Sequence, residues 1–331
     1  MAECLIGIGS NLGDRSPVID SALAELQSNV AIKLRRVSRR HITQPIGGPA
    51  GQDVFMNATA LVDTSLSPIE LLGVLQALES RAGRTRAVRW GARTLDLDLL
   101  LYDDVVMNGK DLVLPHPRMA FRRFVLVPAA EIAPNMSHPV LRRSMMQLLE
   151  HLEQAPNYVA ITGAANVGKS QLVTAVAAKS EAVTVLEGRR SGQSRDSSLW
   201  TPLEKELEFL SRRCELLQSV ASTDKERYVI SDFWLAQCLA YARELSPEDR
   251  QQLEVALLDC CRQVVSPKLI VFVESGLDEA SAGGPTQPHI AIQRNLRKQL
   301  LAPGQPPTLR LDAVNQSWNE EEVVAAILAM A

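Results

Sequence analysis

The hydrophobic positions in the first half of the chain fall into short runs that alternate between strand-like and helix-like spacing. These runs predict strands at 4–9, 32–43, 54–63 and 94–102, and helices at 17–27 and 67–81. The order strand, helix, strand, strand, helix, strand favours an α+β ferredoxin-like sandwich with its helices on one face of the sheet. An amphipathic stretch at 144–152 then gives way to Ala155-Pro156-Asn157, where we place a domain boundary.

The second half has a different pattern. Short apolar runs that predict buried strands occur at 158–162, 183–186, 228–230, 269–273 and 308–311. Buried strands that alternate with helices are typical of an α/β doubly wound parallel sheet. We therefore expect two domains, at residues 1–155 and 156–331. One predicted helix carries an apolar stripe, which we interpret as core or subunit packing, at Leu203, Leu207, Leu210, Cys214 and Leu217.

The composition agrees with two globular domains, since 46% of the 331 residues are apolar and 22% are charged. No apolar run approaches the ~18 residues that span a bilayer, so we expect no membrane insertion. Residues 1–9 lack a basic leader, so we expect no secretion. Five scattered cysteines without a CxxC pair indicate a reducing, cytoplasmic location. The net charge of -3 argues against a nucleic-acid partner.

Asp96 and Asp98 stand two residues apart in a predicted strand, so their carboxylates project from the same face. Neighbouring carboxylates repel one another unless a cation neutralises them. Mg²⁺ prefers such oxygen ligands and is commonly bound together with phosphates. The alternative is a solvated strand face whose acids pair with nearby arginines.

Five arginines lie within 13 residues at the start of this segment: Arg81, Arg84, Arg86, Arg89 and Arg93. Guanidinium groups bind phosphate oxygens through paired hydrogen bonds. The arginines and the carboxylate pair together predict a metal-bound polyphosphate. Transfer from such a substrate depends mainly on positioning and charge neutralisation, so no nucleophilic Ser or Cys is required.

Phe55 and Asn57 lie on one face of another predicted strand. They combine a stacking surface with an amide that can both donate and accept hydrogen bonds, which suits a flat polar heterocycle. The alternative is a core phenylalanine beside an asparagine whose hydrogen bonds are satisfied within the protein.

The motifs of the first half resemble the 6-hydroxymethyl-7,8-dihydropterin pyrophosphokinases of folate biosynthesis, over about residues 3–140. The resemblance rests on Gly9-Ser10-Asn11, Phe55-Met56-Asn57, the run from Arg89 to Leu100, and Leu114-Pro115-His116. It implies transfer of the terminal pyrophosphate of ATP to the pterin hydroxymethyl oxygen, with release of AMP. It also implies two Mg²⁺ ions held by Asp96 and Asp98.

The same resemblance implies the remaining site residues. Arg84 and Arg93 would act in catalysis beside the two aspartates. Nucleotide and phosphate contacts would come from Gln76, Glu79, Arg86, His116 and Arg122. The pterin would lie between Phe55 and Phe124, its edge read by Asn57 and the loop that starts at Thr43, with Trp90 closing over it. Phe55 occupies a position that is often Tyr, and Ala92 one that is often Pro, but stacking needs only the aromatic ring.

The second half contains the segment Gly163-Ala164-Ala165-Asn166-Val167-Gly168-Lys169-Ser170, which follows a predicted strand and opens a predicted helix. This is the G-x-x-x-x-G-K-S pattern of a P-loop in its required context. Backbone amides from Gly163 to Gly168 would hold phosphates, Lys169 would reach the transferred group, and Ser170 would ligate Mg²⁺. The alternative is a glycine turn that merely joins strand to helix.

The second half also resembles deoxynucleoside kinases, over about residues 157–331. The resemblance implies that Glu187 is the base for the sugar hydroxyl, that Arg227 stabilises charge near it, and that Asp232 recognises the nucleobase. Asn166 stands where that family typically has Gly. The arginine-rich lid is reduced to Arg294 and Arg297.

Two other functions remain open. The second half is either a kinase or a non-catalytic nucleotide-sensing or dimerisation module, in which the apolar stripe packs against a second subunit. The first half is either a pterin pyrophosphokinase or a generic metal-dependent nucleotide hydrolase. The expected partners are therefore a pterin, ATP and a deoxynucleoside, together with a second copy of the chain if the stripe forms a homodimer.

Overall fold

The structure is a computed structural model, and the residues it describes are 1–83, 90–188, 202–218, 220, 226–242, 245–275, 288–313 and 319–331. They divide into two compact units. Unit 1 comprises Met1–Glu153 and Ala325–Ala331, and unit 2 comprises Gln154–Val324. The return of the last residues to unit 1 differs from the predicted division, which assigns everything after residue 156 to the second domain.

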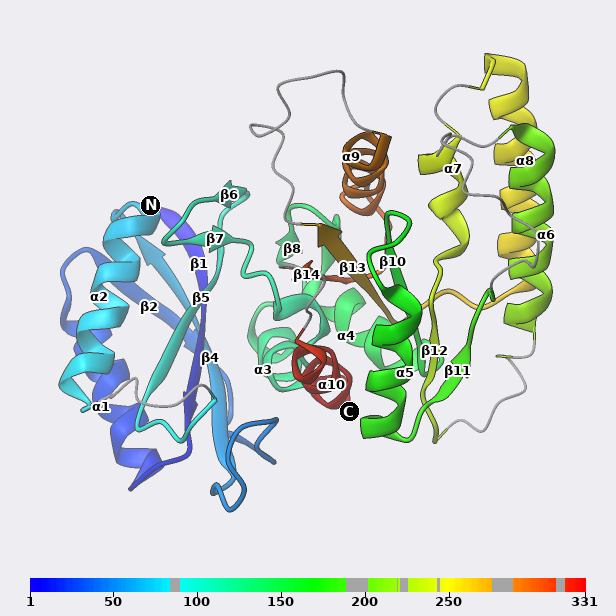
Figure 1. Ribbon diagram of the computed structural model, residues 1–331. Helices are drawn as coiled ribbons and strands as arrows, with labels where there is room; N and C mark the ends of the chain where they lie inside the picture. The colour runs from blue at the N-terminus through cyan, green and yellow to red at the C-terminus, as the bar shows by residue number, and fades with distance from the viewer. Residues whose placement is uncertain are drawn as a thin grey trace. The chain divides into compact units, whose positions relative to one another are not determined.

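Unit 1 is built on a five-stranded antiparallel sheet (Figure 1). Its strands are β1 (Ala2–Ser10), β2 (Ile32–Val37), β3 (His41–Thr43), β4 (Phe55–Thr64) and β5 (Asp96–Tyr102). They lie in the order β2-β4-β1-β5, and β3 also pairs with β4. The first strand of the chain is therefore central, with β4 on one side of it and β5 on the other.

The single strand predicted over 32–43 is divided into β2 and β3. Ser38 lies at the break: its amide donates to the Thr59 carbonyl, and its hydroxyl accepts from the Thr59 amide, both at 3.0 Å. A side chain has thus replaced a backbone carbonyl as the partner of β4, and regular pairing stops. It resumes in β3, where His41 lies opposite Asn57.

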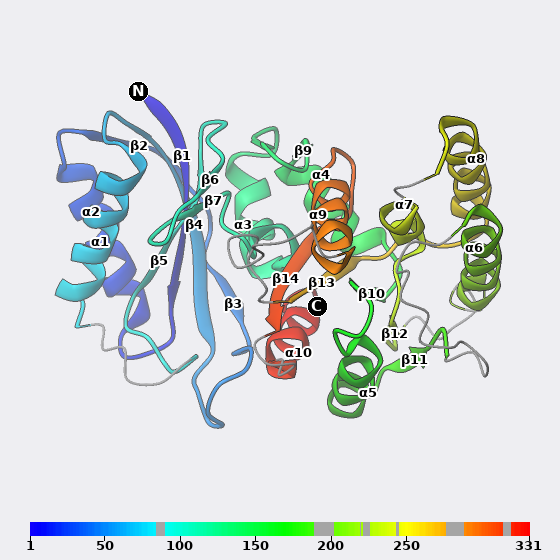
Figure 2. The ribbon, with the colours of Figure 1, turned by 45° about the horizontal axis from the view of Figure 1, so that its top comes forward.

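Helices α1 (Arg15–Ser28) and α2 (Pro68–Arg81) cover one face of this sheet (Figures 1 and 2). Helix α3 (Arg123–Ile132) lies on the opposite face, against β4. The aliphatic core under α1 and α2 includes Ile6, Ile8, Ile19, Leu26, Leu71, Leu75, Leu97 and Leu99. Because Leu97 and Leu99 face this core, the alternate residues Asp96 and Asp98 project from the other face of β5.

Helix α2 begins where the sequence predicts it to begin. Ser67 accepts a hydrogen bond from the Glu70 amide, and the Glu70 carboxylate accepts one from the Ser67 amide at 2.8 Å. This reciprocal capping satisfies backbone donors at the helix start, and Pro68 adds a backbone angle already suited to a helix. The sequence signals for this helix are local, which is why its bounds could be predicted.

Several short elements and one further helix follow in unit 1. They are β6 (Met107–Asn108), β7 (Val113–Leu114), the 3₁₀ turn Met119–Phe121, β8 (Ser137–His138), β9 (Arg143–Ser144) and α4 (Met145–Gln154). The strands pair as β6 with β7 and as β8 with β9.

Unit 2 contains a five-stranded sheet in which every pairing is parallel. Its strands are β10 (Tyr158–Gly163), β11 (Val183–Val185), β12 (Val229–Ser231), β13 (Leu269–Ser275) and β14 (Thr308–Ala313). The order is β11-β12-β10-β13-β14. The chain leaves β10 in one direction toward β11 and β12, and later builds β13 and β14 on the other side. Parallel sheets of this kind bind ligands at the carboxyl ends of the strands where the order reverses.

The helices of unit 2 follow its strands in the chain. They are α5 (Lys169–Ser180), α6 (Leu203–Gln218), the 3₁₀ turn Leu235–Gln237, α7 (Cys238–Tyr241), α8 (Pro247–Gln263) and α9 (Pro288–Leu300). The last helix, α10 (Glu320–Ala329), begins in unit 2 and ends among the residues assigned to unit 1. Helix α5 starts directly after the loop that leaves β10. None of the helices within the described ranges combines the length and apolar character needed to cross a membrane.

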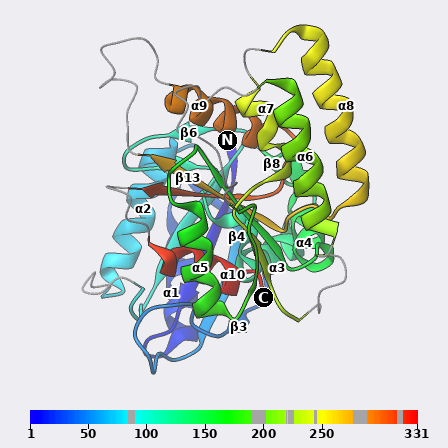
Figure 3. The same ribbon diagram turned by 45° about the vertical axis from the view of Figure 1, so that its right-hand side comes forward.

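Helices α6 and α8 lie side by side (Figures 1 and 3). Leu210, Cys214 and Leu217 of the predicted stripe are buried, and so are Leu253 and Leu257 of α8. This part of the stripe therefore packs within the unit, which agrees with the core interpretation of the pattern.

Candidate active sites

The two aspartates of β5 lie beside glycines of β1. Asp96 is paired with Gly9, and Asp98 with Gly7. The Asp98 side chain is 39% exposed and that of Asp96 is 18% exposed. The neighbouring strand has no side chain at these two positions; the Leu100 side chain lies against Gly7, 3.4 Å from where a Cβ atom would be.

Gly9 also joins the aspartates to the aromatic and amide residues of β4. It is paired with Asn57 on its other side. A Cβ atom at Gly9 would lie 3.3 Å from Asn57 Oδ1, and 3.8 Å from both Asp96 Cβ and Phe55 Cδ1. The side chains of Phe55, Asn57 and Asp96 therefore surround one position. Asn57 is buried and donates to Thr43 Oγ1 at 2.8 Å, so Thr43 lies at the same place.

Asn11 ties three segments together at the end of β1. Its amide nitrogen donates to Gln52 Oε1 at 3.3 Å and to the Asp53 carbonyl at 3.2 Å, and its Oδ1 accepts from the Arg93 amide at 2.7 Å. Gln52 in turn donates to the Trp90 carbonyl at 3.1 Å. The loop before β4 is thus connected to the turn before β5.

The Trp90 ring packs against the loop that follows Thr43. A Cβ atom at Gly47 would lie 2.9 Å from the indole, and one at Gly48 would lie 2.2 Å from the Trp90 carbonyl oxygen. Both glycines have positive φ angles, 72° and 79°. Only glycine fits this approach of the loop to Trp90, at the edge where the sequence predicts pterin recognition.

Arg93 forms an ion pair with Asp96. Its guanidinium therefore lies at the carboxylate pair, in agreement with a shared phosphate site. Arg84 and Arg86, the other predicted arginines of this cluster, lie outside the described residues, within the gap at 84–89.

His116 faces Asp98 as a neutral side chain. Burial, and behind it the charges of Arg122 and Arg118, lowers the pKa of His116 to about 3. Its Nδ1 accepts from the Arg118 amide at 3.2 Å, so the ring proton lies on Nε2, which is 3.9 Å from Asp98 Oδ2. His116 can therefore donate one hydrogen bond toward the carboxylate or toward an anion bound there.

Arg122 and Phe124 lie together at the start of α3. The guanidinium carbon of Arg122 is 5.5 Å from the centre of the Phe124 ring. Burial lowers the pKa of Arg122 to about 10, while Asp98 and Asp96 act in the opposite direction. Arg122 is therefore charged at neutral pH and close to both aspartates. Phe124 is half-buried, as is Phe55.

The structure gives Glu79 a different place from the predicted nucleotide contact. Glu79 is buried and accepts a hydrogen bond from the Leu97 amide at 2.8 Å. Its carboxylate is directed at the backbone of β5, so its direct role is structural. Gln76 lies on the exposed surface of α2.

Within the described ranges, no group of three or more His, Cys, Asp or Glu side chains is arranged to hold a metal ion. The Asp96 and Asp98 pair nevertheless fits Mg²⁺ chemically, because Mg²⁺ is usually bound by one or two carboxylates together with water and substrate phosphates. The nearby cations of Arg93 and Arg122 agree with such a phosphate.

In unit 2 the predicted phosphate loop joins β10 to α5. Lys169 folds over this loop, and its Nζ donates to the Gly163 carbonyl at 3.1 Å and to the Ala164 carbonyl at 2.8 Å. Burial lowers the pKa of Lys169 to about 8. Asn166 and Gly168 have left-handed φ angles of 62° and 81°. Asparagine tolerates this conformation better than most residues, which explains how it can stand at a position typical of glycine.

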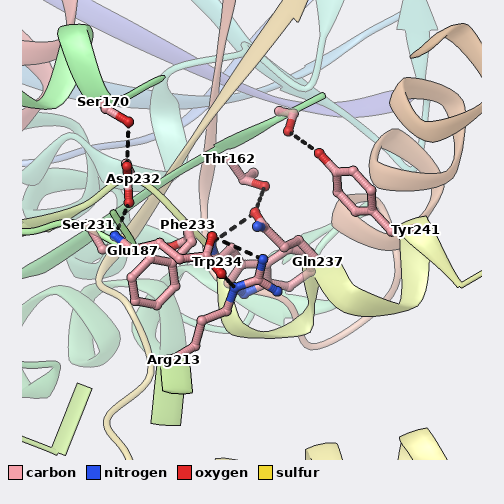
Figure 4. A network of polar contacts seen from close by, with 11 residues as sticks. Thr162, Ser170, Glu187, Arg213, Ser231, Asp232, Phe233, Trp234, Gln237 and Tyr241 are labelled. Carbon is pink, nitrogen blue, oxygen red and sulfur yellow. Dashed lines mark hydrogen bonds and ion pairs between the residues drawn. The ribbon is translucent and has the colours of Figure 1, made fainter. Parts of the chain in front are cut away.

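Asp232 lies against the same loop (Figure 4). One of its carboxylate oxygens accepts from the Ser170 hydroxyl, and the other accepts from the Glu187 amide at 2.9 Å. Both carboxylate oxygens of Asp232 therefore accept hydrogen bonds, at the carboxyl ends of β11 and β12. The predicted role of Asp232 in nucleobase recognition does not fit this placement, which instead puts it beside the hydroxyl expected to ligate Mg²⁺.

Arg227 is placed away from Glu187, so its predicted role is wrong. Arg227 lies just before β12, at the amino end of the strand, and donates to the Glu181 carbonyl at 2.9 Å. Glu187 follows β11 at the carboxyl end, and the two strands are parallel. The residue that pairs with Glu187 is Arg213, at 3.0 Å. Its only sequence signal was a cation beside an apolar helical stripe.

The candidate lid segment forms most of α9. Arg297 pairs there with buried Glu274, at 2.6 Å, and Glu274 also pairs with Arg310 of β14, at 2.6 Å. Arg294 lies on the exposed face of the same helix. Arg297 is therefore bound to the sheet edge in this structure, which differs from a phosphate-binding lid arginine.

A family model for 7,8-dihydro-6-hydroxymethylpterin-pyrophosphokinase (HPPK) matches residues 5–134. The 2-amino-4-hydroxy-6-hydroxymethyldihydropteridine pyrophosphokinase of Synechocystis sp. is 41% identical over 152 residues, which are 45% of this chain and 75% of that protein. The protein of the same name from Bacillus subtilis is 45% identical over 127 residues, 38% of this chain and 75% of that protein.

Among solved structures, the NadR protein in complex with NR has 16% sequence identity and a TM-score of 0.41, over 54% of this chain and 52% of that one. Likeness of this degree carries no conclusion about this chain. The sequence similarity, in contrast, spans the residues around Asp96, Asn57 and Gly9. The chain therefore belongs to the 7,8-dihydro-6-hydroxymethylpterin-pyrophosphokinase family.

Proposed function

We propose that the pyrophosphokinase reaction of unit 1 takes place on the sheet face around Gly9. The observation that carries this proposal is the meeting of Phe55, Asn57 and Asp96 at one glycine. It places Phe55 and Asn57, which suit a heterocycle, next to Asp96 of the carboxylate pair. The strand order, with α1 and α2 on the other face, supports a ferredoxin-like sandwich, and the substrate face also carries α3 against β4.

Each group around Gly9 then has a defined task. Phe55 and Phe124 hold the pterin ring by stacking, and Asn57, fixed by Thr43, reads its polar edge. The loop packed on Trp90 covers the ring. These contacts keep the hydroxymethyl group beside Asp96, where its oxygen can meet the terminal pyrophosphate of ATP.

The phosphate side uses charge rather than covalent chemistry. Asp96 and Asp98 would hold two Mg²⁺ ions, which when bound neutralise phosphate charge and orient the reacting oxygens. Arg93 and Arg122 stabilise charge that develops as the bond to the AMP phosphate breaks. His116 remains neutral and donates its Nε2 proton in a hydrogen bond to a phosphate oxygen.

Product analysis tests this proposal against a generic nucleotide hydrolase. The purified full chain is incubated with Mg²⁺-ATP, with and without 6-hydroxymethyl-7,8-dihydropterin, and AMP and phosphate are measured. AMP formation that requires the pterin, and that is lost in Phe55→Ala, supports the site. The control is Ile42→Ala, at an exposed position of β3. ATP consumption that Phe55→Ala leaves unchanged supports the hydrolase.

For unit 2 we propose nucleotide binding at the 163–170 loop and phosphoryl transfer to a deoxynucleoside. The support is the loop at the carboxyl end of β10, with Lys169 folded over it and Ser170 beside Asp232. Ser170 and Asp232 would hold Mg²⁺, whose charge neutralises the phosphates when it is bound. The carboxylate of Glu187 would accept the proton of the sugar hydroxyl.

The alternative is a non-catalytic nucleotide-binding or dimerisation module. It is distinguished by supplying the full chain with Mg²⁺-ATP and each deoxynucleoside, without pterin. Formation of ADP and a nucleoside monophosphate that Lys169→Ala abolishes supports the kinase. Lys179→Ala, which removes an exposed lysine from the same helix, is the control. Nucleotide binding without these products supports the module.

A further inference from the structure

Arg213 is a buried arginine of α6 whose guanidinium faces Glu187 (Figure 4). Its Nε lies 3.0 Å from Glu187 Oε1, and its Nη2 donates to Glu187 Oε2 at 3.2 Å. The Arg213 side chain is 7% exposed and that of Glu187 is 23% exposed. The carboxylate is therefore the more accessible partner, and the arginine holds it from the protein side.

Two aromatic rings hold the guanidinium in place. Its central carbon is 5.6 Å from the centre of the Phe209 ring and 5.9 Å from that of Phe233. Phe209 precedes it on α6, and Phe233 follows Asp232 after β12. Because a guanidinium is planar and weakly hydrated, rings at these distances stabilise a buried position that lysine would not share.

The pair lies at the nucleotide loop. Glu187 and Arg213 act with Asp232 on the pKa of Lys169, the carboxylates raising it and the arginine lowering it. The Glu187 amide also donates to Asp232, which accepts from Ser170 with its other oxygen. Glu187 is therefore fixed through its backbone by Asp232 and through its side chain by Arg213.

Three polar atoms of this pair make no hydrogen bond of good geometry among the residues that the structure describes. They are Arg213 Nε and Nη1, both donors, and Glu187 Oε1, an acceptor that faces Nε as an ion pair. Buried polar atoms are rarely left without a hydrogen bond in folded proteins. A hydroxyl group, which donates one hydrogen bond and accepts others, matches this combination.

We infer that Arg213 is an acceptor-positioning residue of unit 2, which holds Glu187 and donates to the hydroxyl oxygen of a bound deoxynucleoside. The inference rests on the proposed function of unit 2 and deepens it. It assigns to α6 the cationic role that the sequence pattern gives to Arg227. It also requires deoxynucleoside affinity to depend on Arg213 more strongly than nucleotide affinity does.

Calorimetry on the full chain tests the inference. The chain carries Asp96→Ala and Asp98→Ala, so that unit 1 does not contribute nucleotide binding, and it is titrated with Mg²⁺ and an unreactive ATP analogue. It is then titrated with deoxyadenosine, deoxyguanosine, deoxycytidine and thymidine. For Arg213→Met we expect deoxynucleoside binding to weaken at least about ten-fold, because a charged hydrogen bond is lost. Affinity for the ATP analogue should change by less than about two-fold.

Further variants keep the result clear if Arg213→Met folds poorly. Arg213→Lys keeps the charge but not the paired geometry and should also weaken deoxynucleoside binding, and Glu187→Gln should do so without changing the side-chain shape. Arg250→Met, at an exposed arginine of α8, is the control and should bind normally. Folded Arg213 variants that bind deoxynucleosides like the parent chain would overturn the inference.

If the proposed deoxynucleoside-kinase function of unit 2 is wrong, the binding results will differ. In that case the parent chain binds the ATP analogue, Lys169→Ala abolishes that binding, and none of the four deoxynucleosides binds at all. This result would remove the deoxynucleoside as substrate, and the role of Arg213 with it. A loss confined to the Arg213 and Glu187 variants supports both.

Discussion

Gly9 and Asn57 face each other across β1 and β4, and a Cβ atom at Gly9 would lie 3.3 Å from Asn57 Oδ1. This distance is tighter than most contacts of a real Cβ, so an added methyl group must push the amide away. Asn57 is held by Thr43 and is buried, and it has little room to move.

Gly9→Ala should therefore weaken pterin binding. We expect the KM for the pterin to rise about ten-fold, equivalent to ~1.4 kcal/mol, with a smaller change in the KM for ATP. Steady-state kinetics with each substrate varied in turn provide the measurement. The control is Gly73→Ala on α2, where an added Cβ would meet no atom within 4 Å. Equal effects on both substrates would argue that Gly9 supports the fold rather than the pterin site.

Asp96→Asn and Asp98→Asn should each abolish most of the pyrophosphokinase activity. The amide keeps the shape but lacks the negative charge that binds Mg²⁺, so we expect kcat to fall by at least about 100-fold. Mg²⁺ titrations of the reaction rate should show a weaker apparent metal affinity. Asp104→Asn, on an exposed turn, is the control. Full activity of either site variant at low Mg²⁺ would remove that aspartate from the metal site.

His138 should make unit 1 less stable in mild acid. Burial lowers the pKa of His138 to about 4, and its Nδ1 accepts from the Leu141 amide at 3.2 Å. Between about pH 6.5 and pH 4 the unfolded chain binds a proton that the folded protein excludes, so stability falls as the pH falls. The loss across this window is ~3 kcal/mol, from ~1.4 kcal/mol per pKa unit.

Denaturant unfolding at several pH values measures this effect. His138→Asn keeps an acceptor for the Leu141 amide without a titrating group, so its stability should depend less on pH across the same window. His41→Asn, at a less buried histidine on β3, is the comparison. Identical pH profiles for the parent chain and His138→Asn would contradict the assignment.

Arg297 should contribute to stability and not to nucleotide binding. It forms two hydrogen bonds to buried Glu274, at 2.9 Å and 2.6 Å. Arg297→Ala leaves Glu274 paired with Arg310 alone, and we expect it to lower the free energy of unfolding by ~1–3 kcal/mol. Affinity for an unreactive ATP analogue should stay within about two-fold of the parent value. A large loss of nucleotide affinity with unchanged stability would restore the lid interpretation.

The sequence predicts features whose cause is local and misses those whose cause is distant. Helix α2 could be placed because Ser67, Pro68 and Glu70 signal its start within four residues. The break between β2 and β3 could not, because it depends on a hydrogen bond between Ser38 and Thr59. The sequence around residue 38 contains no pattern that predicts Thr59 as its partner.

The candidate sites follow the same rule. The spacing of Asp96 and Asp98 predicts that they share a face, because strand geometry fixes it. The pairing of Arg213 with Glu187 joins a helix to the end of a strand, and the apolar stripe beside Arg213 on α6 predicts packing rather than an ion pair. Arg227 was misplaced because sequence order does not say at which end of a parallel strand a neighbouring residue will lie.

The strand that carries both aspartates, β5, is also the outermost strand of its sheet. Its backbone groups would be available to another extended chain if nothing blocked them. Glu79 occupies the Leu97 amide, and the His116 amide occupies the Leu100 carbonyl. Glu79 thus protects this edge of the sheet from pairing with another strand. We expect replacement of Glu79 to cause aggregation during folding.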